Sequence, residues 1–280
     1  MTRKMLVKKL FCSVTFSAVT ILIMPSYWKR SLATAASLVV VLGVLAGCAP
    51  ERVPVASTTP TRTASATPVA KPKNFFNKTQ YSLDDPTSIW VVVNKLRPLK
   101  PANFTPTLVT LTVPHVSAPQ MTQEAGDALL KMFAAAAAAG AGQLQIQNSY
   151  RSYSVQVNTH NSLVGSLGQA AADAQSARPG YSEHQTGLAV DVASYPSKCD
   201  IAACFGQTPQ GIWLAANSWQ YGYILRYPAD KTAITGYIYE PWHFRYVGVA
   251  LSTEMHNDGI ETMEEFFGLP PAPDYASATG

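Results

Sequence analysis

Hydrophobic residues recur along the chain with two spacings, one typical of helices and one typical of strands. Thr122 can cap a helix that has an apolar stripe between residues 129 and 133 and that ends at Gly140. Shorter helices are predicted at 212–219 and 261–267.

Runs of alternating or β-branched apolar residues predict strands in the same chain. The predicted strands lie at 89–94, 108–113, 144–148, 188–193, 222–226 and 243–246. Because helices and strands do not follow a regular βαβ alternation, the pattern predicts an α+β domain in which helices flank a small antiparallel sheet.

Residues 1–47 have the composition of an export signal. A basic patch at Lys29 and Arg30 precedes an apolar run over 32–46, which is too short to span a membrane well and ends in small residues. The ending LAGC resembles the lipobox of bacterial lipoproteins, which predicts that Cys48 becomes the lipid-bearing first residue of the mature chain. A plain signal anchor is the alternative. A second basic and apolar stretch comes before Met24, and a translation start at Met24 would explain it.

The segment 48–73 is rich in Pro, Thr, Ala and Ser and has no aromatic residue. Such a composition buries too little surface to fold, so it predicts a lipid-anchored tether ahead of a peptidase domain over 74–269. The tail over 270–280 is expected to be disordered. These features predict an exported lipoprotein on the outer face of the cytoplasmic membrane, and nothing indicates an obligate interface, so we expect a monomer.

The basic character of the chain belongs to its export region. The formal net charge is +4, but the first 47 residues contain six Lys or Arg and no Asp or Glu, so the remainder has a net charge of −2. A nucleic-acid partner is therefore not expected, since it would require clustered Lys and Arg. Cys199 and Cys204 are the two cysteines of the domain. In an oxidising compartment such a pair predicts a disulfide, and a metal site is less favoured because no second ligand pair lies nearby.

Acidic and imidazole side chains gather in the segment 181–192, which reads YSEHQTGLAVDV. In a strand, the period of two places Asp191 between two alanines, on the face opposite the larger apolar residues. The small neighbours leave space beside the carboxylate. His184 comes before Gly187, where the chain can turn so that the imidazole reaches the same face.

The run EPWH places Glu240 and His243 three residues apart. His184, Asp191 and His243 form a suitable ligand set for catalytic zinc, because three protein ligands leave a fourth position for water. Zinc lowers the pKa of that water toward ~7, so Glu240 is expected to take its proton and pass it to a leaving amine. Taken singly, the histidines could be ordinary core or surface residues and Asp191 a strand-end acceptor. Their coincidence on an exported chain favours the metal site.

Four motifs agree in order and spacing with one enzyme family. They are SYRSYSVQ at 149–156, SEHQTGLAVD at 182–191, YGYILRYP at 221–228 and EPWHFRYVG at 240–248. Together they resemble the VanY-type D-Ala-D-Ala carboxypeptidases, which are zinc metallopeptidases, and weaker matches extend the resemblance over the domain from about residue 81. The resemblance implies that His184, Asp191 and His243 bind zinc and that Glu240 is the catalytic base.

The resemblance also assigns Arg151 to the substrate or to the developing oxyanion. A guanidinium can bind a carboxylate through paired hydrogen bonds, although a structural ion pair is the alternative for Arg151. Gln156 and Ser182 are expected to contact the peptide backbone, and Trp242 to form a pocket wall.

The function expected from these residues is zinc-dependent removal of the C-terminal D-alanine from peptidoglycan stem peptides. An L,D-carboxypeptidase that acts on tetrapeptide stems would share this fold and these ligands. A non-catalytic wall-binding module with zinc is a further alternative, but it would not need Glu240 as a proton carrier.

Overall fold

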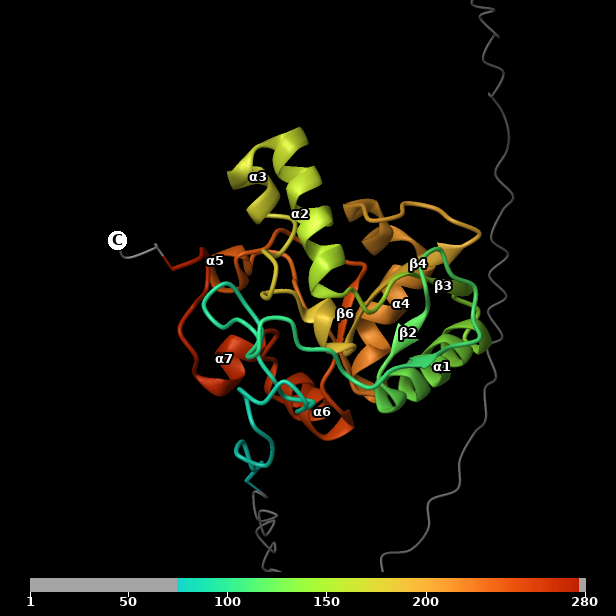
Figure 1. Cartoon of the computed structure of the whole chain (residues 1–280). Helices are drawn as coiled ribbons and strands as arrows, with labels where there is room; N and C mark the ends of the chain where they lie inside the picture. Colours follow the sequence, from blue (N-terminus) through green and yellow to red (C-terminus); the bar gives the residue numbers. More distant parts are fainter. Residues whose placement is uncertain (1–74, 277–280) are drawn as a thin grey trace, which may run out of the picture. The chain divides into compact units, whose positions relative to one another are not determined.

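In the computed structural model, which describes residues 75–276, a four-stranded antiparallel sheet forms the framework of the fold (Figure 1). Its strand order is β3 (Gln143–Asn148), β4 (Ala189–Tyr195), β6 (His243–Tyr246) and β5 (Tyr223–Leu225). A separate ladder joins β1 (Val109–Thr110) to β2 (Gln120–Met121). The predicted α+β class with a small antiparallel sheet is confirmed.

Several sequence predictions lie outside the described residues. They are the export signal over 1–47, the start at Met24, the lipidated Cys48 and the tether over 48–73. The described residues belong to one compact unit, Ala70–Gly280. Among the helices of residues 75–276, we find none that is both long and apolar enough to cross a lipid bilayer.

The main core covers one face of the sheet. Val190 and Val192 of β4 point into it, together with residues of α1 (Gln123–Ala138) and α4 (Pro209–Asn217). Each fully buried side chain of this size contributes roughly 1.5–3 kcal/mol relative to leaving it exposed. Because side chains alternate along a strand, the intervening residues of β4 face the opposite side of the sheet.

A second apolar cluster lies beneath α6 (Val249–Asp258) and α7 (Met263–Phe267), and alternate residues of the segment 89–94 contribute to the two clusters. The strand predicted at 89–94 is wrong, because its only ladder contact in the described chain is an isolated bridge between Asn94 and Arg97. Its apolar alternation reflects burial on both sides and not membership of a sheet.

The sequence pattern does not predict α2 (Tyr153–Leu167), α3 (Gln169–Asp173), α5 (Thr232–Thr235) or α6. α2 has no apolar stripe, since its buried residues are Gln156 and His160. It begins at Ser152, whose hydroxyl accepts a hydrogen bond from the N–H of Val155 at 3.3 Å. Figure 1 shows α2 and α3 lying together, and they contact each other.

The other predicted elements are present with shifted ends, as is common at element boundaries. The helix predicted from Thr122 is α1, although the Thr122 hydroxyl has no hydrogen-bond partner in the described chain. The helix predicted at 212–219 corresponds to α4 followed by the 3₁₀ helix η3 (Ser218–Tyr221). Another 3₁₀ helix is η2 (Ala203–Gln207).

The prediction of disorder from residue 270 is wrong for the described part of the tail. Ala272 is buried, and its N–H donates to the carbonyl of Ile234 at 2.7 Å. The Tyr275 hydroxyl accepts a hydrogen bond from the N–H of Arg178 at 2.7 Å. The guanidinium of Arg178 also lies 4.1 Å from the centre of the Tyr275 ring. The composition of the tail did not reveal this aromatic attachment.

Candidate metal centre and active site

Asp191 and His243 lie next to each other because the sheet pairs them directly. β4 and β6 have a register that places Asp191 opposite His243 and Val190 opposite Phe244. Val190 and Phe244 belong to the main core, so Asp191 and His243 face the other side of the sheet. Nδ1 of His243 lies 3.1 Å from Oδ1 of Asp191. Asp191 is therefore on the face that its alanine neighbours predict.

The 3₁₀ helix η1 (Glu183–Thr186) brings His184 to the same place. Gly187 ends η1 with a φ of 69°, a left-handed conformation that favours glycine, and the chain turns there into β4. Nε2 of His184 lies 3.3 Å from Oδ2 of Asp191. Nδ1 of His184 contacts the carbonyl oxygen of Ser149 at 2.7 Å, so Nδ1 carries the proton and the Nε2 lone pair is free.

These three side chains fit a metal ion. One ligand atom from each of His184, Asp191 and His243 lies within 4.8 Å of the other two, and all three residues are buried. Oδ1 of Asp191 has no partner of suitable hydrogen-bond geometry among residues 75–276. A buried carboxylate oxygen without a partner is costly unless a cation satisfies it. Two imidazoles and one carboxylate are a donor set that zinc accepts in catalytic sites.

The pKa values of the three side chains indicate that a metal ion would displace one proton. Burial lowers the pKa of His184, which is therefore neutral. Burial would raise the pKa of Asp191, but the two histidines hold it well below its usual range. Burial would lower the pKa of His243, but its polar contacts with Asp191 and Glu183 outweigh this effect and raise the pKa to about 9. The displaced proton is that of His243.

Glu240 lies beside this cluster of ligands without belonging to it. The N–H of His243 donates to the carbonyl of Glu240 at 3.1 Å, and Oε2 of Glu240 lies 3.8 Å from Nδ1 of His243. Burial raises the pKa of the Glu240 carboxyl to about 8, although His243 and Arg151 act in the opposite direction. A carboxyl with a pKa near neutrality can accept and release a proton at physiological pH.

Two successive hydrogen bonds hold the side chain of Arg151 in the site. Its Nη1 donates to Oε1 of Gln156 at 2.8 Å, and Nε2 of Gln156 donates to the carbonyl of Ala177 at 2.6 Å. Nη2 of Arg151 lies 3.8 Å from Oδ2 of Asp191. Gln156 is fully buried and does not line the pocket, so it supports Arg151 instead of reaching a substrate backbone, contrary to the sequence prediction.

The side chains of the candidate ligands, Glu240 and Arg151 line one pocket. Ser182 and Trp242 also line it, and their contacts with a substrate stay a prediction. A disulfide joins Cys199 to Cys204, and Ile201 lines the same pocket from the loop that this disulfide closes.

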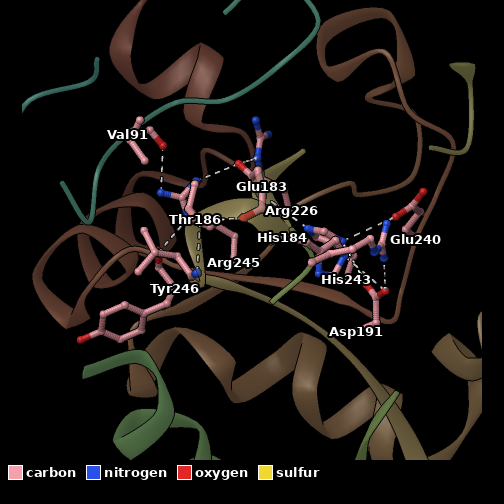
Figure 2. Close-up of polar contacts among 12 residues, drawn as sticks. Val91, Glu183, His184, Thr186, Asp191, Arg226, Glu240, His243, Arg245 and Tyr246 are labelled. Carbon is pink, nitrogen blue, oxygen red and sulfur yellow. Dashed lines mark hydrogen bonds and ion pairs between the residues drawn. The ribbon is translucent and has the colours of Figure 1, made fainter. Parts of the chain in front are cut away.

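Three buried charged residues next to the centre were missed by the sequence analysis. Oε1 of Glu183 accepts hydrogen bonds from Nε of Arg226 at 2.9 Å and from Nη1 of Arg245 at 2.8 Å. Figure 2 shows Glu183 between the arginines and the cluster of His184, His243, Asp191 and Glu240. Glu183 precedes His184 in the same motif, but an acidic residue beside a ligand gives no signal that it is buried. The arginines are 43 and 62 residues away along the chain, so no local pattern links them to Glu183.

Comparisons with a family model, with known sequences and with solved structures all find carboxypeptidases. A family model described as "VanY: D-alanyl-D-alanine carboxypeptidase" matches residues 118–249, a range that contains every candidate ligand, Arg151 and Glu240. The chain is also similar to YodJ of Bacillus subtilis (strain 168), with 38% identity over 192 residues, which cover 66% of this chain and 69% of YodJ.

Two solved structures show the same fold. The LdcB LD-carboxypeptidase, whose structure concerns peptidoglycan recognition, is 38% identical with a TM-score of 0.60, and the match covers 65% of this chain and 87% of LdcB. The vancomycin resistance D,D-pentapeptidase VanY of a VanB-type cassette, solved as a mutant in complex with Zn(II), is 31% identical with a TM-score of 0.54. That match covers 63% of this chain and 97% of the VanY chain.

Proposed function

Because this chain belongs to the VanY family of D-alanyl-D-alanine carboxypeptidases, we propose that it removes the C-terminal D-alanine from the peptide stems of peptidoglycan. It is a zinc metallo-carboxypeptidase that acts on peptidoglycan precursors. The proposal concerns the bond that is cut and the residues that cut it. Its main support is a single pocket that contains the three candidate ligands, the buried carboxyl of Glu240 and the guanidinium of Arg151.

Glu240 is the proton carrier in this proposal. When bound, zinc supplies Lewis-acid chemistry, polarising the scissile carbonyl and acidifying the attacking water. Glu240 accepts a proton from that water as the new oxygen–carbon bond forms. It then donates the proton to the nitrogen of the leaving D-alanine as the carbon–nitrogen bond breaks, which yields a shortened peptide and free D-alanine.

Arg151 binds the free carboxylate at the end of the substrate. Among the described residues that line the pocket, Arg151 is the one Lys or Arg. Its guanidinium is fixed by Gln156, which lowers the entropy lost when a carboxylate binds. A requirement for a free carboxylate makes the reaction a carboxypeptidase reaction and disfavours cleavage inside a longer chain.

Two substrates fit this chemistry. The description of the family model favours a D,D-carboxypeptidase, which removes D-alanine from a pentapeptide stem. The similarity to LdcB favours a second candidate, an L,D-carboxypeptidase that acts on the tetrapeptide stem. Both reactions release D-alanine, and they differ in the chirality of the residue that precedes the scissile bond.

Mass spectrometry of the products distinguishes the two candidates. The unit Ala70–Gly280, with one equivalent of zinc, is incubated separately with pentapeptide and tetrapeptide stems. Loss of one alanine from the pentapeptide supports the D,D reaction, and loss from the tetrapeptide alone supports the L,D reaction. If neither peptide is shortened by the zinc-loaded protein, the proposed function is wrong.

The cellular location is a further part of the proposal. The basic and apolar pattern of residues 1–47 and the LAGC ending support export and a lipid anchor at Cys48, on the outer face of the cytoplasmic membrane. Full-length protein labelled in cells with a radioactive fatty acid should lose the label in the Cys48→Ala variant. Equal labelling of both proteins would rule out Cys48 as the anchor. We also propose that the unit is a monomer, which light scattering measures directly.

A further inference from the structure

Four charged side chains with no exposed surface form one network beside the metal centre. Arg226 binds the carboxylate of Glu264 through two parallel hydrogen bonds, of 2.9 and 2.7 Å. Its Nε donates to Glu183, which also accepts from Arg245. Two positive and two negative charges balance, which makes complete burial of the network tolerable.

The network fixes Glu183 against distant parts of the fold. Arg245 lies on β6, two residues after His243, and donates to the backbone carbonyls of Ile89, Val91 and Tyr246 at 2.8–3.0 Å. Arg226 is held in turn by Glu264 on α7. The Glu183 side chain cannot rotate away without leaving buried guanidinium N–H groups unpaired, which is costly.

The two carboxylate oxygens of Glu183 have different neighbours. Oε1 accepts both arginine hydrogen bonds. Oε2 is buried, has no hydrogen bond within residues 75–276 and lies 3.5 Å from Nε2 of His243. That imidazole nitrogen is also buried and unpartnered in the described chain. The two atoms can satisfy each other only when the proton of His243 is on Nε2.

We propose that Glu183 is a positioning residue for the metal centre, which holds the proton of His243 on Nε2 and so presents Nδ1 to the metal ion. His184 would face the metal ion through its other ring nitrogen, Nε2. The carbonyl of Ser149 holds the His184 proton on Nδ1, and Nε2 lies beside Asp191. The centre therefore uses Nε2 of one histidine and Nδ1 of the other. This inference rests on the metal-binding part of the proposed function and is independent of the substrate.

The Glu183→Gln variant tests the proposal through zinc affinity. An amide has one acceptor oxygen and one donor nitrogen, so it cannot accept protons from the arginines and from His243 at the same time. We expect the zinc Kd of the unit Ala70–Gly280 to rise about 10–100-fold, the usual loss when a group that orients a metal ligand is removed. The Kd is measured by competition with a chromophoric chelator, after circular dichroism has established that the variant is folded.

Glu264→Gln is the matched control. It removes the same charge from the same buried network and perturbs the same arginine, but Glu264 does not contact His243. Its zinc Kd should rise far less than that of Glu183→Gln, because Arg245 still holds Glu183 in place. Native affinity in Glu183→Gln, or an equal loss in both variants, would overturn the proposal. If the native protein itself binds no zinc, the proposed function fails instead.

Nuclear magnetic resonance of the unaltered protein provides a test that does not depend on folding of a variant. In the zinc-loaded unit with ¹⁵N-labelled histidine, His243 should have a metal-bound Nδ1 and a slowly exchanging proton on Nε2. His184 should show the reverse assignment. A proton on Nδ1 of His243 with zinc on its Nε2 would contradict the proposed role of Glu183.

Discussion

Replacement of Glu240 by Gln should stop hydrolysis while leaving the metal centre and the fold intact. The Glu240 side chain lies 3.8 Å from Nδ1 of His243 and the residue is 6% exposed, so it can reach the reacting groups without being a ligand. General acid–base catalysis by one positioned group contributes about 10²–10⁴-fold in rate. Because we assign both proton transfers to Glu240, we expect kcat/KM to fall by ~10³–10⁴-fold, or ~4–5.5 kcal/mol of activation free energy.

The assay measures release of D-alanine by the native and Glu240→Gln proteins, each loaded with one equivalent of zinc, together with the zinc Kd and the Tm. Burial raises the pKa of Glu240 to about 8, so the pocket favours an uncharged side chain. The pKa of Glu240 is higher in the folded state than in the unfolded chain. The free energy of unfolding of the metal-free protein therefore decreases as the pH rises from ~4.3 toward 8, because Glu240 must then ionise in a buried site. Compared without zinc, the Gln variant should therefore not have a lower Tm at pH 7 than the native protein. If the zinc-loaded variant keeps more than about a tenth of the native kcat/KM, far above the loss expected for a proton carrier, the assignment of Glu240 is refuted.

Three further predictions concern the ligands and the substrate. His243→Ala should abolish stoichiometric zinc in the purified unit, as measured by elemental analysis, because it removes one of three ligands, whereas the exposed His256→Ala should keep it. The zinc Kd should fall by about tenfold for each unit of pH between 7 and 8.5, because zinc must displace one proton from His243, whose pKa is raised to about 9. A zinc titration at several pH values checks this, and a pH-independent Kd would show that His243 is already neutral. Arg151→Lys should reduce kcat/KM for peptides with a free C-terminus by about 10–100-fold, because Lys cannot bind a carboxylate bidentately. The same kcat/KM in native and variant protein would remove Arg151 from the substrate site.

The sheet and the candidate ligands were predictable because their signals are local. The alternation around Asp191 places large apolar residues on one face and the carboxylate on the other, and the core confirms this division. β6 has the predicted bounds of 243–246, because the aromatic, β-prone residues Phe244 and Tyr246 alternate there with polar ones. The likeness of four spaced motifs to one family then supported the candidate ligand set without any knowledge of the pairing between β4 and β6.

The buried charged residues beside the candidate ligands were not predictable, because their role depends on contacts between residues that are distant in the sequence. Nothing in the sequence distinguishes Glu183, which is completely buried, from an exposed glutamate. Its arginine partners occupy strand or strand-end positions where a basic residue would ordinarily face solvent. The helix α2 was missed for a different reason, since the residues that it buries, Gln156 and His160, are polar. Such a helix is stabilised by hydrogen bonds and not by an apolar stripe, so a search for hydrophobic periodicity cannot find it.

The most direct test of the whole account is a zinc titration of chelator-treated protein, in which D-alanine release from stem peptide is followed at each step. Activity should be absent without metal and should rise in proportion to added zinc. It should reach its maximum at one equivalent, because His184, Asp191 and His243 form one site. Full activity before zinc is added, or a plateau only at two or more equivalents, would contradict a single zinc centre built from these three residues.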